Sequence, residues 1–221
     1  MWGLTWDERL LDLLLPRTCA GCREDLPPPM QGPLCGPCLG LLARRRLPPP
    51  RRRNGRLLGP VSAAFAYAPP LPALVHAFKY GRRLAVGDAL GAWMAGAWGL
   101  GEGGAAPDAL VPVPLHPRRE RDRGFNQARI LARWVSGRTG VPVWDALRRQ
   151  THTPPQARVR RSRRARAMTN AFRADPDLDL WARRIVLIDD VCTTGGTLEG
   201  CALALFEAGA AAVDAFVLAQ A

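Results

Sequence analysis

Lysine is almost absent from this sequence, because Lys79 is the only lysine among 31 basic residues. A phosphate-binding P-loop ends in Gly-Lys-Ser/Thr, so that class of nucleotide-binding protein is excluded. A phosphoacceptor receiver domain needs a lysine on a strand after its clustered aspartates, and no lysine follows Lys79. No G-x-G-x-x-G fingerprint opens the helix predicted at Thr197–Ala208, which excludes the usual dinucleotide-binding loop there.

Long apolar runs are lacking as well. None approaches the ~20 residues that a membrane-spanning helix needs, which predicts a protein without membrane insertion. The segment from Trp6 to Leu15 has an apolar stripe, but carboxylates interrupt it and no basic leader precedes it. We interpret it as a short amphipathic helix rather than a signal peptide. A cytoplasmic location is therefore expected, where thiols stay reduced and cysteines bind metal more often than they form disulfides.

The length of 221 residues suits one α/β domain with a small appendage. With 48% hydrophobic and 23% charged residues, the composition is that of a globular rather than a disordered chain. Three zones are predicted: an N-terminal helix with a four-cysteine module at 1–46, a Pro/Arg-rich linker at 47–60, and the main domain at 61–221.

Short apolar strands alternate with helical patterns throughout the main domain. Strands are predicted at Val61–Tyr67, Ala109–Val113, Val141–Leu147, Arg184–Ile188 and Ala211–Leu218. Helices are predicted at Leu71–Tyr80, Leu84–Trp98, Asn126–Arg138 and Thr197–Ala208. This alternation predicts an α/β fold with a mostly parallel sheet covered by helices on both faces.

The formal net charge of +12 is unevenly distributed. Residues 118–173 contain sixteen arginines against three acids, whereas residues 174–221 contain two arginines against eight acids. Such a positive field indicates a polyanionic partner, such as phosphate, pyrophosphate or nucleic acid. For its densest part, Arg148–Asn170, a solvated basic face and a nucleic-acid contact both stay open, and the scarcity of aromatics there argues against base stacking.

Four cysteines form two C-x-x-C knuckles that twelve residues separate. They are Cys19, Cys22, Cys35 and Cys38. Four thiolates make a closed tetrahedral set that suits structural zinc, without an open position for catalysis. Redox pairs or two disulfides are the alternatives, although paired knuckles at this spacing favour zinc.

A second motif follows the apolar strand predicted at Arg184–Ile188. Asp189 and Asp190 stand at its carboxyl end, where open parallel sheets bind ligands, and can accept hydrogen bonds from a vicinal diol such as that of ribose. The turn Thr193–Thr197 offers hydroxyls, backbone N–H groups and a helix N-terminus for one phosphate. Together they predict a site for ribose 5-phosphate. The alternative is a strand that ends in two acids by chance before a glycine turn.

The segment Ile185–Thr197 resembles the binding motif of type I phosphoribosyltransferases. Three more parts of the chain match one branch of that superfamily. They are Val111–Pro117 followed by arginines and Gly124-Phe125-Asn126-Gln127-Ala128, Phe78-Lys79-Tyr80 upstream, and the cysteine quartet. The chain thus resembles the ComF family, competence-associated proteins that are phosphoribosyltransferase-like. The resemblance implies a mostly parallel sheet with flanking helices, a small hood that contains Lys79, and an N-terminal zinc-ribbon-like module.

The resemblance also implies roles for individual residues. Substrate binding would fall to Asp189, Asp190, Val191, Cys192, Thr193, Thr194, Gly195, Gly196, Thr197, Pro114, Leu115 and His116. Catalysis would involve Asp189, Asp190 and Arg118, with Pro114–His116 as the pyrophosphate loop. For His116, a hydrogen bond within this loop is favoured over acid/base catalysis. Residues 148–170 fall where the superfamily has its mobile catalytic loop.

Two functional hypotheses follow. In the favoured one, the protein binds phosphoribosyl pyrophosphate with magnesium, transfers the phosphoribosyl group to an unknown acceptor, and acts in DNA uptake during natural competence. In the alternative, it is a non-catalytic phosphoribosyl sensor or a scaffold that handles single-stranded DNA. Single-stranded DNA and a competence helicase are candidate partners in this setting.

Overall fold

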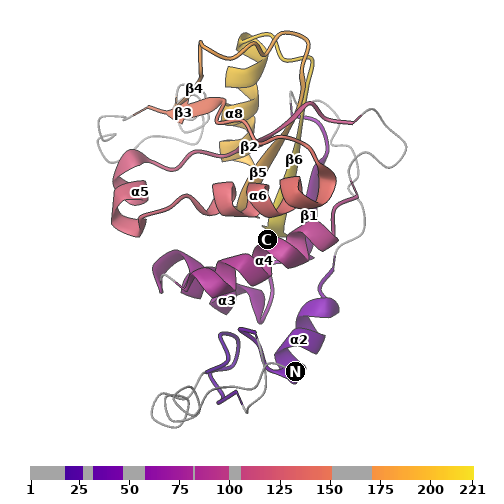
Figure 1. The fold of residues 1–221 in the computed structure, drawn as a ribbon, viewed down its shortest axis with the longest axis vertical. Helices are drawn as coiled ribbons and strands as arrows, with labels where there is room; N and C mark the ends of the chain where they lie inside the picture. Colours follow the sequence, from indigo (N-terminus) through magenta and orange to yellow (C-terminus); the bar gives the residue numbers. More distant parts are fainter. Residues whose placement is uncertain (1–17, 27–31, 47–57, 82, 100–105, 151–170) are drawn as a thin grey trace.

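The computed structural model describes residues 18–26, 32–46, 58–81, 83–99, 106–150 and 171–221 (Figure 1). The helix predicted at Trp6–Leu15, most of the Pro/Arg-rich linker and most of the arginine-rich stretch 148–170 lie outside these residues. Within the described part of the chain, no helix is both long and apolar enough to span a membrane.

A four-stranded parallel sheet forms the centre of the molecule. Its strands, in spatial order, are β1 (Val61–Ala66), β6 (Ala212–Gln220), β5 (Arg184–Cys192) and β2 (Ala109–Pro112). The two central strands read as nearly continuous apolar runs because helices cover the sheet on both faces. The α/β fold with a mostly parallel sheet that the sequence predicts is therefore confirmed.

Two hydrophobic clusters separate the faces of the sheet. Along β5, Val186 and Ile188 belong to one cluster, and Ile185 and Leu187 to the other, because successive side chains of a strand point to opposite faces. The first face is covered by α3 (Leu71–Tyr80), α4 (Leu84–Gly96) and α6 (Gln127–Thr139). The second is covered by α8 (Gly196–Glu207).

The strand predicted at Val141–Leu147 does not form as such. Only Val143 makes an isolated parallel bridge, to Leu110 of β2. Pro142 has no N–H to donate, so this segment cannot extend the ladder. The regular pairing starts later, where β3 (Leu147–Arg149) lies antiparallel to β4 (Phe172–Ala174).

A short helix that the sequence analysis missed, α5 (Pro117–Arg123), follows β2. The side chain of His116 caps its N-terminus, and Pro117 occupies the first turn, where a missing N–H costs nothing. Gly124 ends it with φ 82°, a left-handed conformation that favours glycine.

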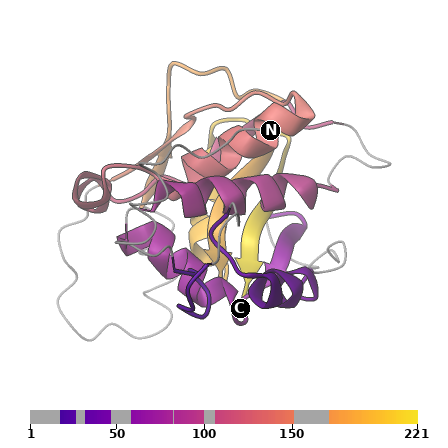
Figure 2. The same ribbon diagram turned by 60° about the horizontal axis from the view of Figure 1, so that its bottom comes forward.

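The cysteine-bearing segments pack against the first face of the sheet, beside α3 (Figures 1 and 2). They include α2 (Gly36–Ala43). Arg45, just after this helix, accepts the backbone N–H of Ala66 at its carbonyl, so the end of the cysteine-bearing segment lies along the edge of β1. Cys19, Leu34 and Cys38 share one hydrophobic cluster with residues of α3. The four-cysteine module and the α/β unit therefore have a common apolar core.

Candidate functional site

The acidic pair lies within β5 rather than after it, since the strand continues to Cys192. The backbone N–H of Asp190 donates to Oδ1 of Asp189 over 2.8 Å. By the alternation of the strand, Asp189 points toward the face of α8 and Asp190 toward the face of α3, α4 and α6. The two carboxylates are therefore neighbours with different surroundings.

Asp190 forms an ion pair across the molecule. Its Oδ2 lies 2.7 Å from Nζ of Lys79 at the end of α3, and the side chains are only 11% and 20% exposed, respectively. A charge-assisted contact at this distance with little solvent is stronger than a surface pair. The sequence singles out Lys79 as the only lysine, but nothing in the sequence indicates this partner.

Asp189 has a different electrostatic environment. Burial, together with the negative charge of Asp190, raises the pKa of Asp189 to about 7, although the N–H of Asp190 and the charges of Lys79 and Arg149 oppose the shift. Arg149, whose positive charge acts on Asp189, has a shifted pKa of its own: burial and, after it, repulsion from Arg119 lower the pKa of Arg149. Arg119 and Arg149 therefore place two positive charges close together, with Asp189 near Arg149.

The loop after β5 turns directly into α8. Gly195 precedes the helix with φ 80°, and its carbonyl accepts the N–H of Glu199. The first N–H groups of a helix have no partner within the helix, so they can bind an anion. Thr193 and Thr194 are exposed beside them, whereas Cys192 is buried and its carbonyl accepts the N–H of Ala221.

The loop Pro114–His116 lies next to the acidic pair because β2 and β5 are neighbours. Pro112 is in register with Ile188, and the N–H of Val113 donates to the carbonyl of Ile188 over 2.9 Å. The side chain of Asn126 connects this loop to α6, since its Nδ2 donates to the carbonyl of Val113 and its Oδ1 accepts the N–H of Ala128.

His116 and Arg118 serve the local structure in this loop. Nδ1 of His116 accepts the backbone N–H of Arg118 over 3.2 Å, in keeping with the predicted hydrogen-bonding role of the histidine. The Arg118 side chain is exposed. Among the described residues, Lys79 and Arg149 are the cations whose charges act on the acidic pair. The sequence carried no signal for Arg149, since only the pairing of β3 with β4 gives it this position.

A pocket of about 500 Å³ opens beside Lys79. It is lined by Lys79, Tyr80, Arg119, Asp122 and Arg123, from the end of α3 and from α5. The guanidinium of Arg123 lies 5.0 Å from the centre of the Tyr80 ring. Three cations against one acid make this pocket suitable for an anionic group.

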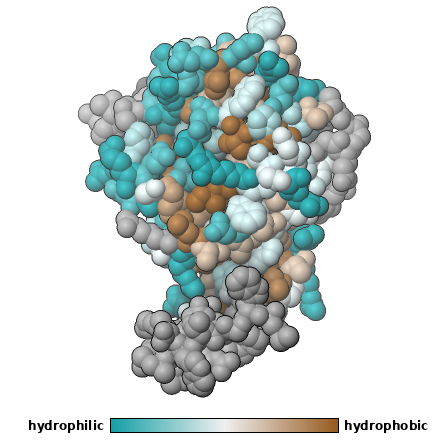
Figure 3. All heavy atoms as spheres, viewed as in Figure 1, coloured by the Kyte–Doolittle hydropathy of each residue, from teal (hydrophilic) through white to brown (hydrophobic). Residues whose placement is uncertain are grey.

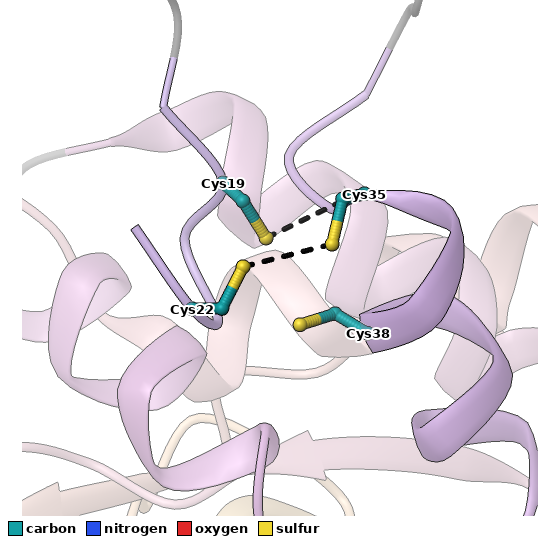
Figure 4. A group of neighbouring side chains, drawn as sticks. All are labelled: Cys19, Cys22, Cys35 and Cys38. Atoms are coloured by element: carbon teal, nitrogen blue, oxygen red, sulfur yellow. Dashed lines mark hydrogen bonds between the residues drawn. The ribbon is translucent and has the colours of Figure 1, made fainter. Parts of the chain in front are cut away.

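The four cysteines of the N-terminal module converge on one point (Figure 4). All four Sγ atoms lie within 4.8 Å of one another, and those of Cys22 and Cys35 are 3.6 Å apart. Four ligands at about 2.3 Å from a zinc ion stand about 3.8 Å apart in a tetrahedron, so this spacing fits a metal centre and is far too long for a disulfide. The module is positioned to bind a metal ion.

Backbone donors support the charge of Cys19. Burial opposes ionisation of this thiol, but N–H groups from both knuckles point at its sulfur and lower the pKa of Cys19 to about 6. Those of Gly21 and Cys35 lie 3.4 and 3.3 Å from Sγ. The arrangement resembles that of a thiolate ligand, because N–H groups stabilise the charged sulfur.

Comparison with curated proteins finds relatives over most of the chain. The DNA utilization protein YhgH of Escherichia coli K12 is 34% identical over 200 residues, covering 84% of this chain and 77% of that protein. Competence protein F of Haemophilus influenzae and competence protein ComFC of Bacillus subtilis are each 34% identical, over 52% and 49% of this chain and 51% and 43% of their own lengths. No protein-family model matches.

Solved phosphoribosyltransferase structures show a more distant likeness. A glutamine phosphoribosylpyrophosphate amidotransferase from B. subtilis is 19% identical with a TM-score of 0.44, covering 64% of this chain and 30% of that enzyme. A hypoxanthine phosphoribosyltransferase from Trypanosoma cruzi is 15% identical with a TM-score of 0.34, covering 61% of this chain and 65% of that enzyme.

Proposed function

This chain belongs to the ComF family of competence-associated, phosphoribosyltransferase-like proteins, and we propose that it binds phosphoribosyl pyrophosphate with magnesium. One observation carries the proposal. The acidic pair of β5, the N-terminus of α8 and the loop Pro114–His116 meet at one edge of the parallel sheet. That edge is where open α/β sheets bind ligands.

Each part of the site suits one part of this ligand. Asp189 and Asp190 offer carboxylate oxygens to the ribose hydroxyls, and the turn Thr193–Thr197 offers N–H and hydroxyl groups to the 5-phosphate. The loop Pro114–His116 would face the pyrophosphate. Burial and, after it, repulsion from Arg119 lower the pKa of Arg149, so the two guanidinium groups repel one another. A polyanion placed beside them would relieve that repulsion.

The oxygen donors of the acidic pair also fit magnesium. Mg²⁺ prefers one or two carboxylates together with substrate phosphates, and β5 presents two carboxylates beside the proposed phosphate sites. When bound, the ion would neutralise charge on the pyrophosphate. In the transfer itself, the bond between the anomeric carbon and the pyrophosphate oxygen breaks, and a nucleophile forms a new bond to that carbon. The protein's arginines would stabilise the departing charge.

The four-cysteine module is proposed to hold structural zinc. Four thiolates leave no open position for a substrate, and the spacing of the sulfur atoms matches a zinc tetrahedron. The metal would then stabilise the N-terminal module rather than take part in phosphoribosyl transfer.

Calorimetric titration with phosphoribosyl pyrophosphate and Mg²⁺ tests the main proposal. Wild type should bind saturably, while Asp189→Asn and Asp190→Asn should each weaken binding about 10- to 100-fold, the effect of losing a charged hydrogen-bond partner. Asp145→Asn is the matched control, because this acid is 58% exposed and pairs with Arg129 on α6. Absence of saturable heat with wild type would refute the proposal.

A second candidate function, handling of single-stranded DNA, rests on three pockets that share lining residues. The pocket beside Lys79 shares Arg123 with a second pocket of about 500 Å³, and this shares Arg133 with a third of about 650 Å³. Tyr80 at one end and Trp134 at the other are 63% and 40% exposed. Hydrophilic surface with apolar parts between lies over α5 and α6 (Figure 3). Cations with exposed aromatic rings are what sequence-tolerant strand binding uses.

The names of the relatives, DNA utilization protein and competence protein, support this second role. The candidate protein partner for this role is a competence helicase. Fluorescence anisotropy with a labelled oligonucleotide separates the two functions: Arg133→Gln should reduce the salt dependence of binding by about one in log–log slope and leave phosphoribosyl pyrophosphate affinity unchanged. Equal DNA binding by wild type and Arg133→Gln at every salt concentration would argue against DNA binding along these pockets.

A further inference from the structure

The helix α3 connects two sites that the preceding sections treat separately. Lys79 at its C-terminal end contacts Asp190 of the sugar-phosphate site over 2.7 Å. Its N-terminal end contacts the four-cysteine module, which lies directly beside it in both ribbon views (Figures 1 and 2). A single ten-residue helix therefore separates the metal centre from the acidic pair.

The first knuckle of the module contacts the chain on both sides of α3. A methyl group on Gly21 would come within 3.0 Å of Cβ of Pro70, the residue that precedes the helix, and within 2.9 Å of Sγ of Cys38. Beyond the other end of α3, a guanidinium nitrogen of Arg83 donates to the carbonyl of Thr18 over 3.4 Å. Residues on both sides of Cys19 thus contact the chain next to both ends of α3.

The buried face of α3 packs against residues of the same cysteine module. Leu71 and Leu74 are fully buried, in one cluster with Leu34, Cys19 and Cys38. Isolated helices of about ten residues are not stable in water, so the packing of this face holds α3 in place. A module whose knuckles spread apart would remove part of that packing.

The contact at the far end of α3 is sensitive to such a change. A shift of the helix by about 1 Å would lengthen the contact between Nζ of Lys79 and Oδ2 of Asp190 beyond hydrogen-bonding distance. Two adjacent carboxylates repel one another, and they also repel a polyanionic ligand. Lys79 offsets one of these charges, so its loss would weaken the binding of such a ligand.

We propose that the four-cysteine module positions Lys79 through α3, so that metal binding at the cysteines and ligand binding at the acidic pair are thermodynamically coupled. This inference rests on the proposed binding of phosphoribosyl pyrophosphate. Lys79 is the positioning residue, acting on the ligand through Asp190. Coupling of this kind is reciprocal: the metal raises the affinity for the ligand, and the ligand raises the affinity for the metal by the same factor.

A thermodynamic cycle that combines metal removal with Lys79→Met tests whether the coupling passes through Lys79. Removing zinc from wild type with a chelator should weaken phosphoribosyl pyrophosphate binding about tenfold, within the usual range for coupled sites. In Lys79→Met, which binds more weakly from the start, the same removal should change affinity by less than about twofold. Equal factors in the two proteins would overturn the inference, and no binding by zinc-loaded wild type would instead refute the proposed function.

Gly21→Ala changes the module without removing a cysteine, which covers the case in which metal removal unfolds the chain. With its zinc retained, this variant should bind phosphoribosyl pyrophosphate about 5- to 10-fold more weakly. Gly40→Ala is the matched control, since a methyl group there meets nothing within 4 Å, and its affinity should equal that of wild type. Wild-type affinity in zinc-loaded Gly21→Ala would contradict the inference.

The reciprocal measurement needs no enzymatic activity. Zinc affinity is measured by competition with a chromophoric chelator, with and without saturating phosphoribosyl pyrophosphate. The ligand should tighten zinc binding by the same factor, about tenfold in wild type, and have no such effect in Lys79→Met. Identical zinc affinities for wild type in both conditions would overturn the coupling.

Discussion

Nζ of Lys79 lies 2.7 Å from Oδ2 of Asp190, which joins the end of α3 to β5 at the proposed ligand-binding edge of the sheet. The two side chains come from α3 and β5, and both are largely removed from water. A carboxylate in such a place needs a partner, because an unpaired buried charge is costly. Lys79, the only lysine of the chain, thus pairs with one carboxylate of the acidic motif.

Replacing this lysine should destabilise the protein. Lys79→Met leaves the carboxylate of Asp190 without its cation, and we expect a loss of about 1–3 kcal/mol in the free energy of unfolding. Arg129→Met is the control, because its partner Asp145 is 58% exposed and surface pairs contribute about 0–1 kcal/mol. Urea denaturation measures both, and equal losses in the two variants would contradict this account of the ion pair.

The raised pKa of Asp189 predicts a pH dependence of stability. Burial and Asp190 raise it to about 7 in the folded state, against about 3.9 in an unfolded chain. Between these values the folded protein binds more protons than the unfolded one, so this group lowers stability as pH rises from about 4 to about 7. Asp189→Asn keeps Oδ1 as the acceptor for the N–H of Asp190 and should be more stable than wild type at pH 8, with the difference vanishing toward pH 4.

Asp175 supplies a control of opposite sign for that measurement. Hydrogen bonds from Arg148, and then from the N–H of Asp177, lower the pKa of Asp175. Its stabilising contribution is therefore present above the unfolded pKa and is lost as pH falls through the folded value. Asp175→Asn should be less stable than wild type at neutral pH, by an amount that stays constant down to about pH 4 and disappears only below it. Chemical denaturation from pH 8 down to about pH 2 measures this, so across pH 4–8 only Asp189→Asn should change relative to wild type.

Zinc content should depend on the quartet and not on the other cysteines. Cys22→Ser removes one ligand of the set, and the purified variant should retain little zinc. Cys201→Ala is the control, since this thiol is fully buried on the inner side of α8 and lies outside the quartet. Metal analysis by mass spectrometry measures both proteins. A full equivalent of zinc in Cys22→Ser would show that the quartet is not the site.

Asn126 should contribute to stability through two separate hydrogen bonds. Asn126→Ala removes both the cap of α6 and the donor to the carbonyl of Val113, at an expected cost of about 1–3 kcal/mol. Asn126→Ser retains a good capping acceptor but cannot donate to Val113, so its cost should be smaller. Denaturant titration of the two variants separates the contributions, and a harmless Asn126→Ala would mean that the loop is held by other contacts.

Much of the fold could be predicted from local pattern. Apolar runs of strand length, helical spacing and the Asn126 cap identified most helices and strands, because those signals depend on residues a few positions apart. The segment at 141–147 was predicted wrongly as a strand of the sheet. Its apolar content suits a strand, but Pro142 interrupts the ladder, and the regular pairing begins only at Leu147.

The sequence by itself determined the two chemical groups of this protein: four cysteines with the spacing of a metal centre, and two aspartates before a threonine–glycine turn. The acidic pair and its turn are consecutive, and the two cysteines of each knuckle are three positions apart, so local backbone geometry brings the members of each of these groups together. The tertiary structure alone decided that Lys79 meets Asp190, that Arg149 stands near Asp189, and that the cysteine module packs on α3. These contacts arise from the packing of helices on opposite faces of one sheet, which no spacing along the chain encodes.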